Sequence, residues 1–261
     1  MAYHTRRRAL QLDALNDRIV PSASFVESGT ELTVRGDHSA NVVTITDNGT
    51  GDAGNITVQL DDQPLFTSTG AITSITVITG SGGDVVEYDL TGDLSVNRDV
   101  TVRLGNGNDS FVADLTGNLV AGGNLELHGL GGNGWDTLRL TGTGGDVADG
   151  SKLTVDFLGG NGRDTVNVDY TGVVIGNFDL EVHGGNGKDT VNANVTADTG
   201  STGTVTAHVF GGNGKDSLSL FVTKTTDTDT VTVDATIDGG HGKDEFFNSD
   251  NVIVVDAPKS H

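Results

Sequence analysis

A short glycine-rich motif that ends in aspartate recurs seven times along the chain, and this repeat limits the possible folds more than any other feature. A well-formed copy reads Gly131-Gly132-Asn133-Gly134-Trp135-Asp136, whereas the first copy lacks the asparagine and the second has Leu104 in place of the leading glycine. The seven motifs end at Asp84, Asp109, Asp136, Asp164, Asp189, Asp216 and Asp244. Successive differences between these numbers are 25, 27, 28, 25, 27 and 28 residues, which indicates a duplicated unit of three coils.

Every unit has the same local pattern. An alternating segment such as Leu125-Glu126-Leu127 enters the turn, and a second one such as Thr137-Leu138-Arg139-Leu140 leaves it. The second and fourth residues after each aspartate are predicted to point inward: Leu138/Leu140, Val166/Val168 and Leu218/Leu220. One unit cannot bury its apolar face alone, but stacked units share a continuous core. The sequence therefore predicts an all-β fold, a parallel β-solenoid (β-helix) of about seven coils of ~27 residues. The alternative is a β-sandwich with the turns at one end.

Four segments follow from this pattern. Residues 1–22 form a leader, residues 23–79 an irregular N-terminal β cap, residues 80–250 the solenoid, and residues 251–261 a last strand and tail. The open end of a β-stack needs such a cap, because unpaired strand edges invite association. Strands are expected in the cap at residues 31–34, 42–46, 55–58 and 75–78.

The charge of the chain excludes several partners. The sequence holds 36 acidic and 15 basic residues, a formal net charge of −21, and no cysteine. Such a surface repels nucleic-acid phosphates and attracts cations, so we expect no nucleic-acid partner. No apolar run approaches the ~18 residues of a transmembrane helix, so we expect no membrane insertion.

The Gly-Gly-Asn-Gly-x-Asp turn resembles the calcium-binding nonapeptide of RTX (repeats-in-toxin) proteins. That resemblance implies Ca²⁺ held by the seven aspartates, with glycine carbonyls facing the ion and only oxygen ligands, as a hard cation prefers. The implied backbone positions are Gly105, Gly107, Gly132, Gly134, Gly160, Gly162, Gly185, Gly187, Gly212, Gly214, Gly240 and Gly242.

The repeat departs from the RTX pattern in ways that keep a second interpretation open. There is one motif per coil instead of two, so only one side of the rod can hold an ion column. The x position is Arg163, Lys188, Lys215 or Lys243 in four coils, and these cations could neutralise the aspartates without metal. In a metal-free ladder, stacked asparagines bond to one another and each aspartate accepts a backbone N–H.

The N-terminal leader, residues 1–22, bears on the cellular location of the protein. It has no apolar h-region of a signal peptide, but resembles the N-terminal segment of planctomycete extracellular proteins through Leu12, Leu15, Asp17, Arg18, Pro21 and Ser22. That resemblance implies an extracellular or cell-surface location. The alternative is a short basic amphipathic helix without a targeting role.

We expect no enzymatic activity and no catalytic residues. Carbohydrate-active β-helix enzymes need different chemical groups on one face, whereas each ladder here repeats one chemistry. His128 and His208 lie 80 residues apart in equivalent places, and together with His183 they are expected to be solvated or ladder residues. The predicted function is a calcium-binding structural or adhesive module whose partners are divalent cations and a cell-surface polysaccharide or protein. The alternatives are a metal-free structural solenoid and a carbohydrate-active β-helix, which a groove with mixed carboxylate and basic residues would favour.

Overall fold

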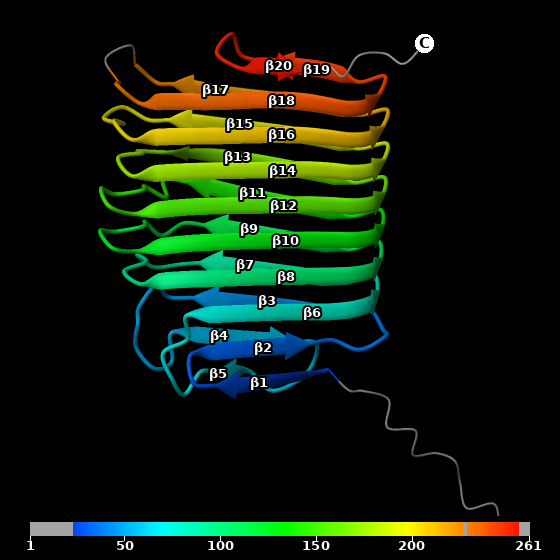
Figure 1. Cartoon of the computed structure of the whole chain (residues 1–261). Helices are drawn as coiled ribbons and strands as arrows, with labels where there is room; N and C mark the ends of the chain where they lie inside the picture. Colours follow the sequence, from blue (N-terminus) through cyan, green and yellow to red (C-terminus); the bar gives the residue numbers. More distant parts are fainter. Residues whose placement is uncertain (1–22, 227–228, 256–261) are drawn as a thin grey trace, which may run out of the picture.

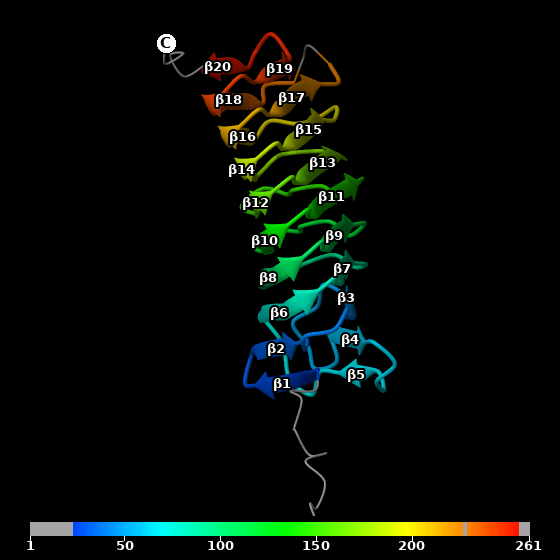
Figure 2. The same ribbon diagram turned by 90° about the vertical axis from the view of Figure 1, so that its right-hand side faces the viewer.

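The computed structural model describes residues 23–226 and 229–255, which form an elongated stack of β-coils without a helix in the described part (Figures 1 and 2). The predictions for the leader, residues 1–22, fall outside the described residues.

Sheet A contains, in spatial order, β1 (Ser24–Ser28), β2 (Glu31–Arg35), β6 (Ser74–Gly82), β8 (Asn97–Gly107), β10 (Asn124–Gly134), β12 (Lys152–Gly162), β14 (Asn177–Gly187), β16 (Thr204–Gly214), β18 (Thr232–Gly242) and β20 (Ile253–Val255). Sheet B contains, from the opposite end, β19 (Glu245–Asn248), β17 (Ser217–Lys224), β15 (Thr190–Ala197), β13 (Thr165–Gly172), β11 (Thr137–Thr143), β9 (Ser110–Leu115), β7 (Val85–Leu90), β3 (Val42–Asp47), β4 (Ile56–Leu60) and β5 (Phe66–Thr67).

Successive coils pair in parallel and in register, so equivalent residues lie above one another. Between β10 and β12, for example, Leu125 pairs with Leu153 and Asn133 with Asn161. Sheet A stands in front of sheet B in Figure 1, and Figure 2 shows the two sheets as parallel columns. The parallel register confirms the predicted β-solenoid and excludes the sandwich, whose neighbouring strands would be antiparallel.

The core lies between the two sheets and follows the predicted alternation. Leu138, Leu140, Val166 and Val168 are completely buried, and most inward residues of the entering strands are buried as well, whereas Val233 is partly buried. Among the described residues, the side away from the turns carries no full sheet. There the return segments meet through isolated parallel bridges that join Leu94, Leu119, Val147 and Val174. These four side chains are also buried and close the third side of the core.

The N-terminal end departs from the parallel pattern. β1 and β2 pair antiparallel, and so do β3 with β4 and β4 with β5, before β2 and β3 pass in parallel to β6 and β7. The four strands expected at 31–34, 42–46, 55–58 and 75–78 correspond to β2, β3, β4 and β6. Phe25 of β1 and Phe66 of β5 lie 5.1 Å apart between ring centroids and pack against the core, so the hairpins cover its first layer.

A buried ion pair joins this end to the coils. Arg98 of β8 donates from Nε to Asp47 of β3 at 2.6 Å, and both side chains are completely buried. The hydroxyl of Tyr88 donates to the same carboxylate at 2.8 Å. Burial, together with the charge of Asp47, raises the pKa of Tyr88 well above its usual value. The three side chains therefore form one buried polar cluster, in which only Nη1 of Arg98 has no hydrogen-bond partner.

Candidate functional site

The seven glycine-rich turns form one edge of the rod, where the strands of sheet A lead into those of sheet B (Figure 1). Each turn carries its aspartate inward. Asp84, Asp109, Asp136, Asp164, Asp189 and Asp216 are at most 3 % exposed, and Asp244 in the last turn is intermediate. The residue before each aspartate points outward instead, as with Trp135, which is 65 % exposed. We call the seven inward residues the aspartate column.

One oxygen of each carboxylate ties two coils together. The backbone N–H of Asp136 donates to Oδ1 of Asp164 at 2.8 Å, and the same bond recurs from Asp84 to Asp244 at 2.7–2.9 Å. At the start of the column, Asn41 donates its N–H to Oδ1 of Asp84. The Oδ1 row is therefore a structural ladder, as the metal-free interpretation expected.

A second ladder runs along the outside of the same turns. The Nδ2 group of Asn133 donates to Oδ1 of Asn106 at 2.9 Å, and Asn161, Asn186 and Asn213 continue the series at 2.7–3.0 Å. These asparagines are exposed. The series confirms the expected asparagine ladder, and it leaves each side chain with a fixed orientation.

The second carboxylate oxygen has no such partner. Oδ2 of all seven aspartates is buried and forms no hydrogen bond. In the five turns that begin with glycine, Oδ2 lies instead over that leading glycine. A Cβ added to Gly159 would lie 2.9 Å from Oδ2 of Asp164 and 2.5 Å from the carbonyl oxygen of Gly184 in the next coil. The same two kinds of oxygen converge on Gly131, Gly184 and Gly211.

In the first coil, the backbone carbonyl oxygen at the equivalent place accepts a hydrogen bond from a side chain. There the leading residue is Thr79, and its hydroxyl donates to the carbonyl oxygen of Leu104 at 2.7 Å. The second coil has Leu104 at this place, and the later coils have glycine. At Gly131, Gly159, Gly184 and Gly211, one carboxylate oxygen therefore lies beside one carbonyl oxygen, without a side-chain donor from the leading residue between them.

These leading glycines were not among the expected backbone positions of the ion site. The structure places the predicted second and fourth glycines, such as Gly132 and Gly134, in the ladder itself, with φ of 110° and 141° that only glycine adopts readily. The leading Gly131 lies beneath the carboxylate instead. The alternation through Leu127 and Gly129 places it inward, and that signal could have identified it.

Burial shifts the acidity of the aspartate column. It raises the pKa of Asp136, Asp164 and Asp216 to about 6, with a further contribution from the neighbouring aspartates. The pKa values of Asp109 and Asp189 are also raised, chiefly by burial. A buried row of like charges needs compensation by protons or cations, because neither solvent nor an adjacent base provides it.

The basic residues of the turns do not provide it either. Arg163, Lys188, Lys215 and Lys243 are exposed, and in residues 23–226 and 229–255 no ion pair joins them to the aspartate column. Lys215 pairs with Glu245 at 3.2 Å instead. The structure therefore does not show the neutralisation that the sequence allowed.

The donor set of the column fits a hard cation, because it consists of carboxylate and carbonyl oxygens alone. No three His, Cys, Asp or Glu side chains gather into a metal cluster in the described part of the chain. A cation in the column would therefore depend on the Oδ2 atoms together with backbone oxygens.

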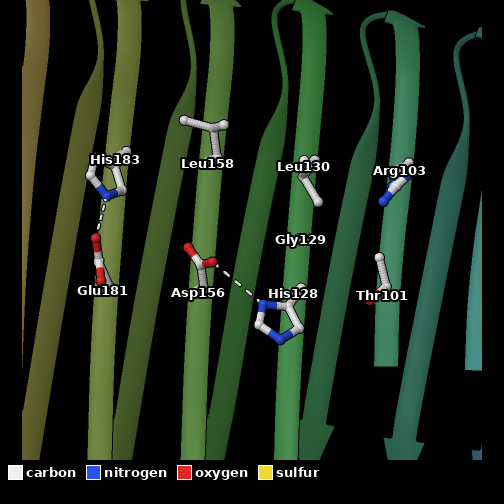
Figure 3. A pocket seen from close by; sticks show the side chains of 9 residues that line it. All are labelled: Thr101, Arg103, His128, Gly129, Leu130, Asp156, Leu158, Glu181 and His183. Carbon is white, nitrogen blue, oxygen red and sulfur yellow. Dashed lines mark hydrogen bonds and ion pairs between the residues drawn. The ribbon is translucent and has the colours of Figure 1, made fainter. Parts of the chain in front are cut away.

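A second feature lies on the outer face of sheet A, where a groove of about 480 Å³ crosses β8, β10, β12 and β14 (Figure 3). Two adjacent rows of residues line it. One row is Arg103, Leu130, Leu158 and His183, and the other is Thr101, His128, Asp156 and Glu181. The expectation that each ladder repeats one chemistry holds for the turns, but it is wrong for this face.

Polar contacts hold the groove side chains in place. His128 Nδ1 lies 3.4 Å from Asp156 Oδ2, and His183 Nε2 lies 2.7 Å from Glu181 Oε1. The imidazole of His183 also stacks on Phe210 of β16, with ring centroids 4.6 Å apart and planes 13° from parallel. These histidines therefore have specific partners on the sheet surface.

Comparisons of the chain with protein-family models, curated proteins and solved structures found no match. Within the described residues no helix is long and apolar enough to cross a membrane. The fold and the aspartate column together define the class: a β-solenoid repeat protein with an internal aspartate ladder along one edge.

Proposed function

We propose that the protein is a structural repeat module whose aspartate column binds calcium ions and is stabilised by them. The observation that carries this proposal is the row of seven buried Oδ2 atoms without a hydrogen-bond partner. An ionised carboxylate in such a place is costly, and stacked carboxylates repel one another. A divalent cation between coils would offset the desolvation of the buried carboxylates and would turn the repulsion between them into attraction to the shared ion.

The chemistry of the row favours calcium over magnesium. Ca²⁺ accepts six to eight oxygen ligands in flexible geometry, including backbone carbonyls, whereas Mg²⁺ demands a near-octahedral shell and keeps several waters. Asp164 Oδ2 and the Gly184 carbonyl oxygen are oxygens of the kind calcium takes, and they repeat from coil to coil. The resemblance of the turns to RTX repeats is consistent with this choice.

The proposed setting is the cell surface or the extracellular space, on the strength of the leader's resemblance to exported proteins. A rigid rod with a covered N-terminal end suits a structural or adhesive module, whose partner would be a polysaccharide or protein of that surface. No catalytic role is proposed.

The test is thermal unfolding of the full chain at pH 7, in chelator and in millimolar CaCl₂, followed by circular dichroism. Calcium is expected to raise Tm, with magnesium much less effective. Asp164→Asn keeps an oxygen that can accept the N–H of Asp136 and replaces Oδ2 with an amide that can donate to the Gly184 carbonyl. This variant should therefore melt higher than wild type in chelator, and calcium should raise its Tm less.

Asp169→Asn is the matched control, because Asp169 is exposed on the outer face of sheet B. Its response to calcium should equal that of the wild type. A Tm that is the same in chelator and in millimolar calcium would overturn the calcium proposal and leave the metal-free structural solenoid.

A further inference from the structure

We propose that the groove on the outer face of sheet A binds an uncharged oligosaccharide chain lying along the rod. This inference narrows the partner in the proposed function to one chemical class, and it does not depend on calcium in the aspartate column. The groove lies on the sheet surface (Figure 3), whereas the carboxylates of the column are buried inside the turns.

The shape of the groove fits an extended ligand. Its two rows follow the stacking direction across four strands, so it extends over three strand spacings of about 4.8 Å. The ligand would therefore cross the strands at right angles. A peptide that adds to a sheet needs free backbone groups at an edge, and the strands of the groove are paired on both sides. This arrangement argues against a peptide strand as the occupant.

The two sides of the groove differ in a way that matches a sugar ring. Leu130 and Leu158 form an apolar strip, which continues into the flat stack of His183 on Phe210. Beside the strip, Asp156 and Glu181 offer hydrogen-bond acceptors. Sugars have apolar C–H faces and hydroxyl edges, so one ring can contact both sides together. The groove is more polar than a usual ligand site, whose walls are mostly apolar, because Thr101, Arg103, His128, Asp156, Glu181 and His183 line it. A sugar with many hydroxyls suits such a lining.

The negative charge of the chain and of the groove favours uncharged saccharides over anionic ones. The chain carries a formal net charge of −21, and two carboxylates lie in the groove itself. Uronic-acid or sulfated polymers would be repelled. Arg103 at one end and the imidazoles of His128 and His183 provide donors, so the hydroxyls of an uncharged chain would find both donors and acceptors.

The experiment is affinity electrophoresis of the full chain in calcium, through gels that contain β-glucan, galactomannan or dextran, with hyaluronan and dextran sulfate as charged probes. At least one uncharged polymer should retard the protein. Leu158→Ala, which removes the apolar strip, and Asp156→Asn, which removes a charged acceptor, should each weaken the apparent affinity about tenfold.

Each variant has a matched control outside the groove. Ile175→Ala removes an exposed apolar side chain of the return segment, and Asp169→Asn changes an exposed carboxylate on sheet B. Both should be retarded like the wild type, and circular dichroism verifies folding of all four. Absence of retardation by every uncharged polymer, stronger retardation by the charged ones, or equal effects in groove and control variants would overturn the proposal. Since all gels contain calcium, these outcomes are independent of the chelator test.

Discussion

At the scale of single residues, the leading glycine of the later turns leaves free space beside the aspartate column. No Cβ separates the carboxylate of Asp164 from the Gly184 carbonyl oxygen at Gly159, whereas the first two turns have Thr79 and Leu104 at the equivalent position. The backbone of Gly159 itself does not need a left-handed conformation, unlike that of Gly160 with φ of 111°. The requirement at Gly159 is therefore one of space.

Gly159→Ala tests this requirement. The new Cβ would lie 2.5 Å from the Gly184 carbonyl oxygen and 2.8 Å from Cβ of Asp164, and neither atom is the end of a flexible chain. We expect a loss of about 1–3 kcal/mol in the free energy of unfolding, as for other overpacked cores. Gly83→Ala is the control, because its Cβ would meet only Asn108 O at 3.5 Å. Equal Tm values for the two variants would contradict the assignment.

At the scale of secondary-structure elements, the joint between cap and coils depends on one charged pair. β3 supplies Asp47 and β8 supplies Arg98. In the described part of the later coils no such buried pair occurs, and the equivalent inward residues Leu125 and Leu153 are apolar. A buried pair specifies which strands meet more than it stabilises them, because the desolvation of both charges offsets their attraction.

Arg98→Ala should therefore be far more damaging than an ordinary arginine replacement. It leaves the carboxylate of Asp47 buried without its cation, and loss of one partner of such a pair costs about 3–5 kcal/mol. Arg139→Ala, on the exposed outer face of β11, should change the free energy of unfolding by about 0.5 kcal/mol or less. Urea denaturation of both variants measures the difference. Similar midpoints would show that the cluster does not hold the joint.

At the scale of the whole molecule, the aspartate column makes stability depend on pH. The folded pKa of Asp136, Asp164 and Asp216 is about 6, above the ordinary value of 3.8. Between these two values the folded chain binds more protons than the unfolded chain, so stability falls as the pH rises. The stabilisation is fully present below about pH 4 and is lost above about pH 6.

In chelator, Tm should accordingly fall from pH 4 to pH 6 and level off above. In millimolar calcium the fall in Tm should be smaller, because bound cations would balance the negative charge of the ionised aspartates. The triple variant Asp136→Asn, Asp164→Asn, Asp216→Asn should flatten the curve in chelator. Thermal melts at each pH measure all three samples, and a Tm that rises between pH 4 and pH 6 in chelator would contradict the assigned direction.

Sequence alone determined the repeat and its single row of turns. It also predicted the parallel stack over a β-sandwich and inward positions such as Leu138 and Leu140, with the asparagine ladder as part of the metal-free alternative. These features depend on local alternation and on a spacing that the chain itself displays, so they need no knowledge of long-range contacts.

Only the tertiary structure decided how the aspartates face and what surrounds them. The turn reverses the chain, so the alternation of the entering strand does not carry through it, and the inward direction of Asp164 over Gly159 follows from the completed corner. The groove on sheet A was not predicted, although its two rows lie six and eight residues before the aspartates of four motifs. Its residues do not repeat one chemistry, so no ladder signal marked them, and Arg103, Asp156 and His183 are recognised as one surface only in the stacked coils.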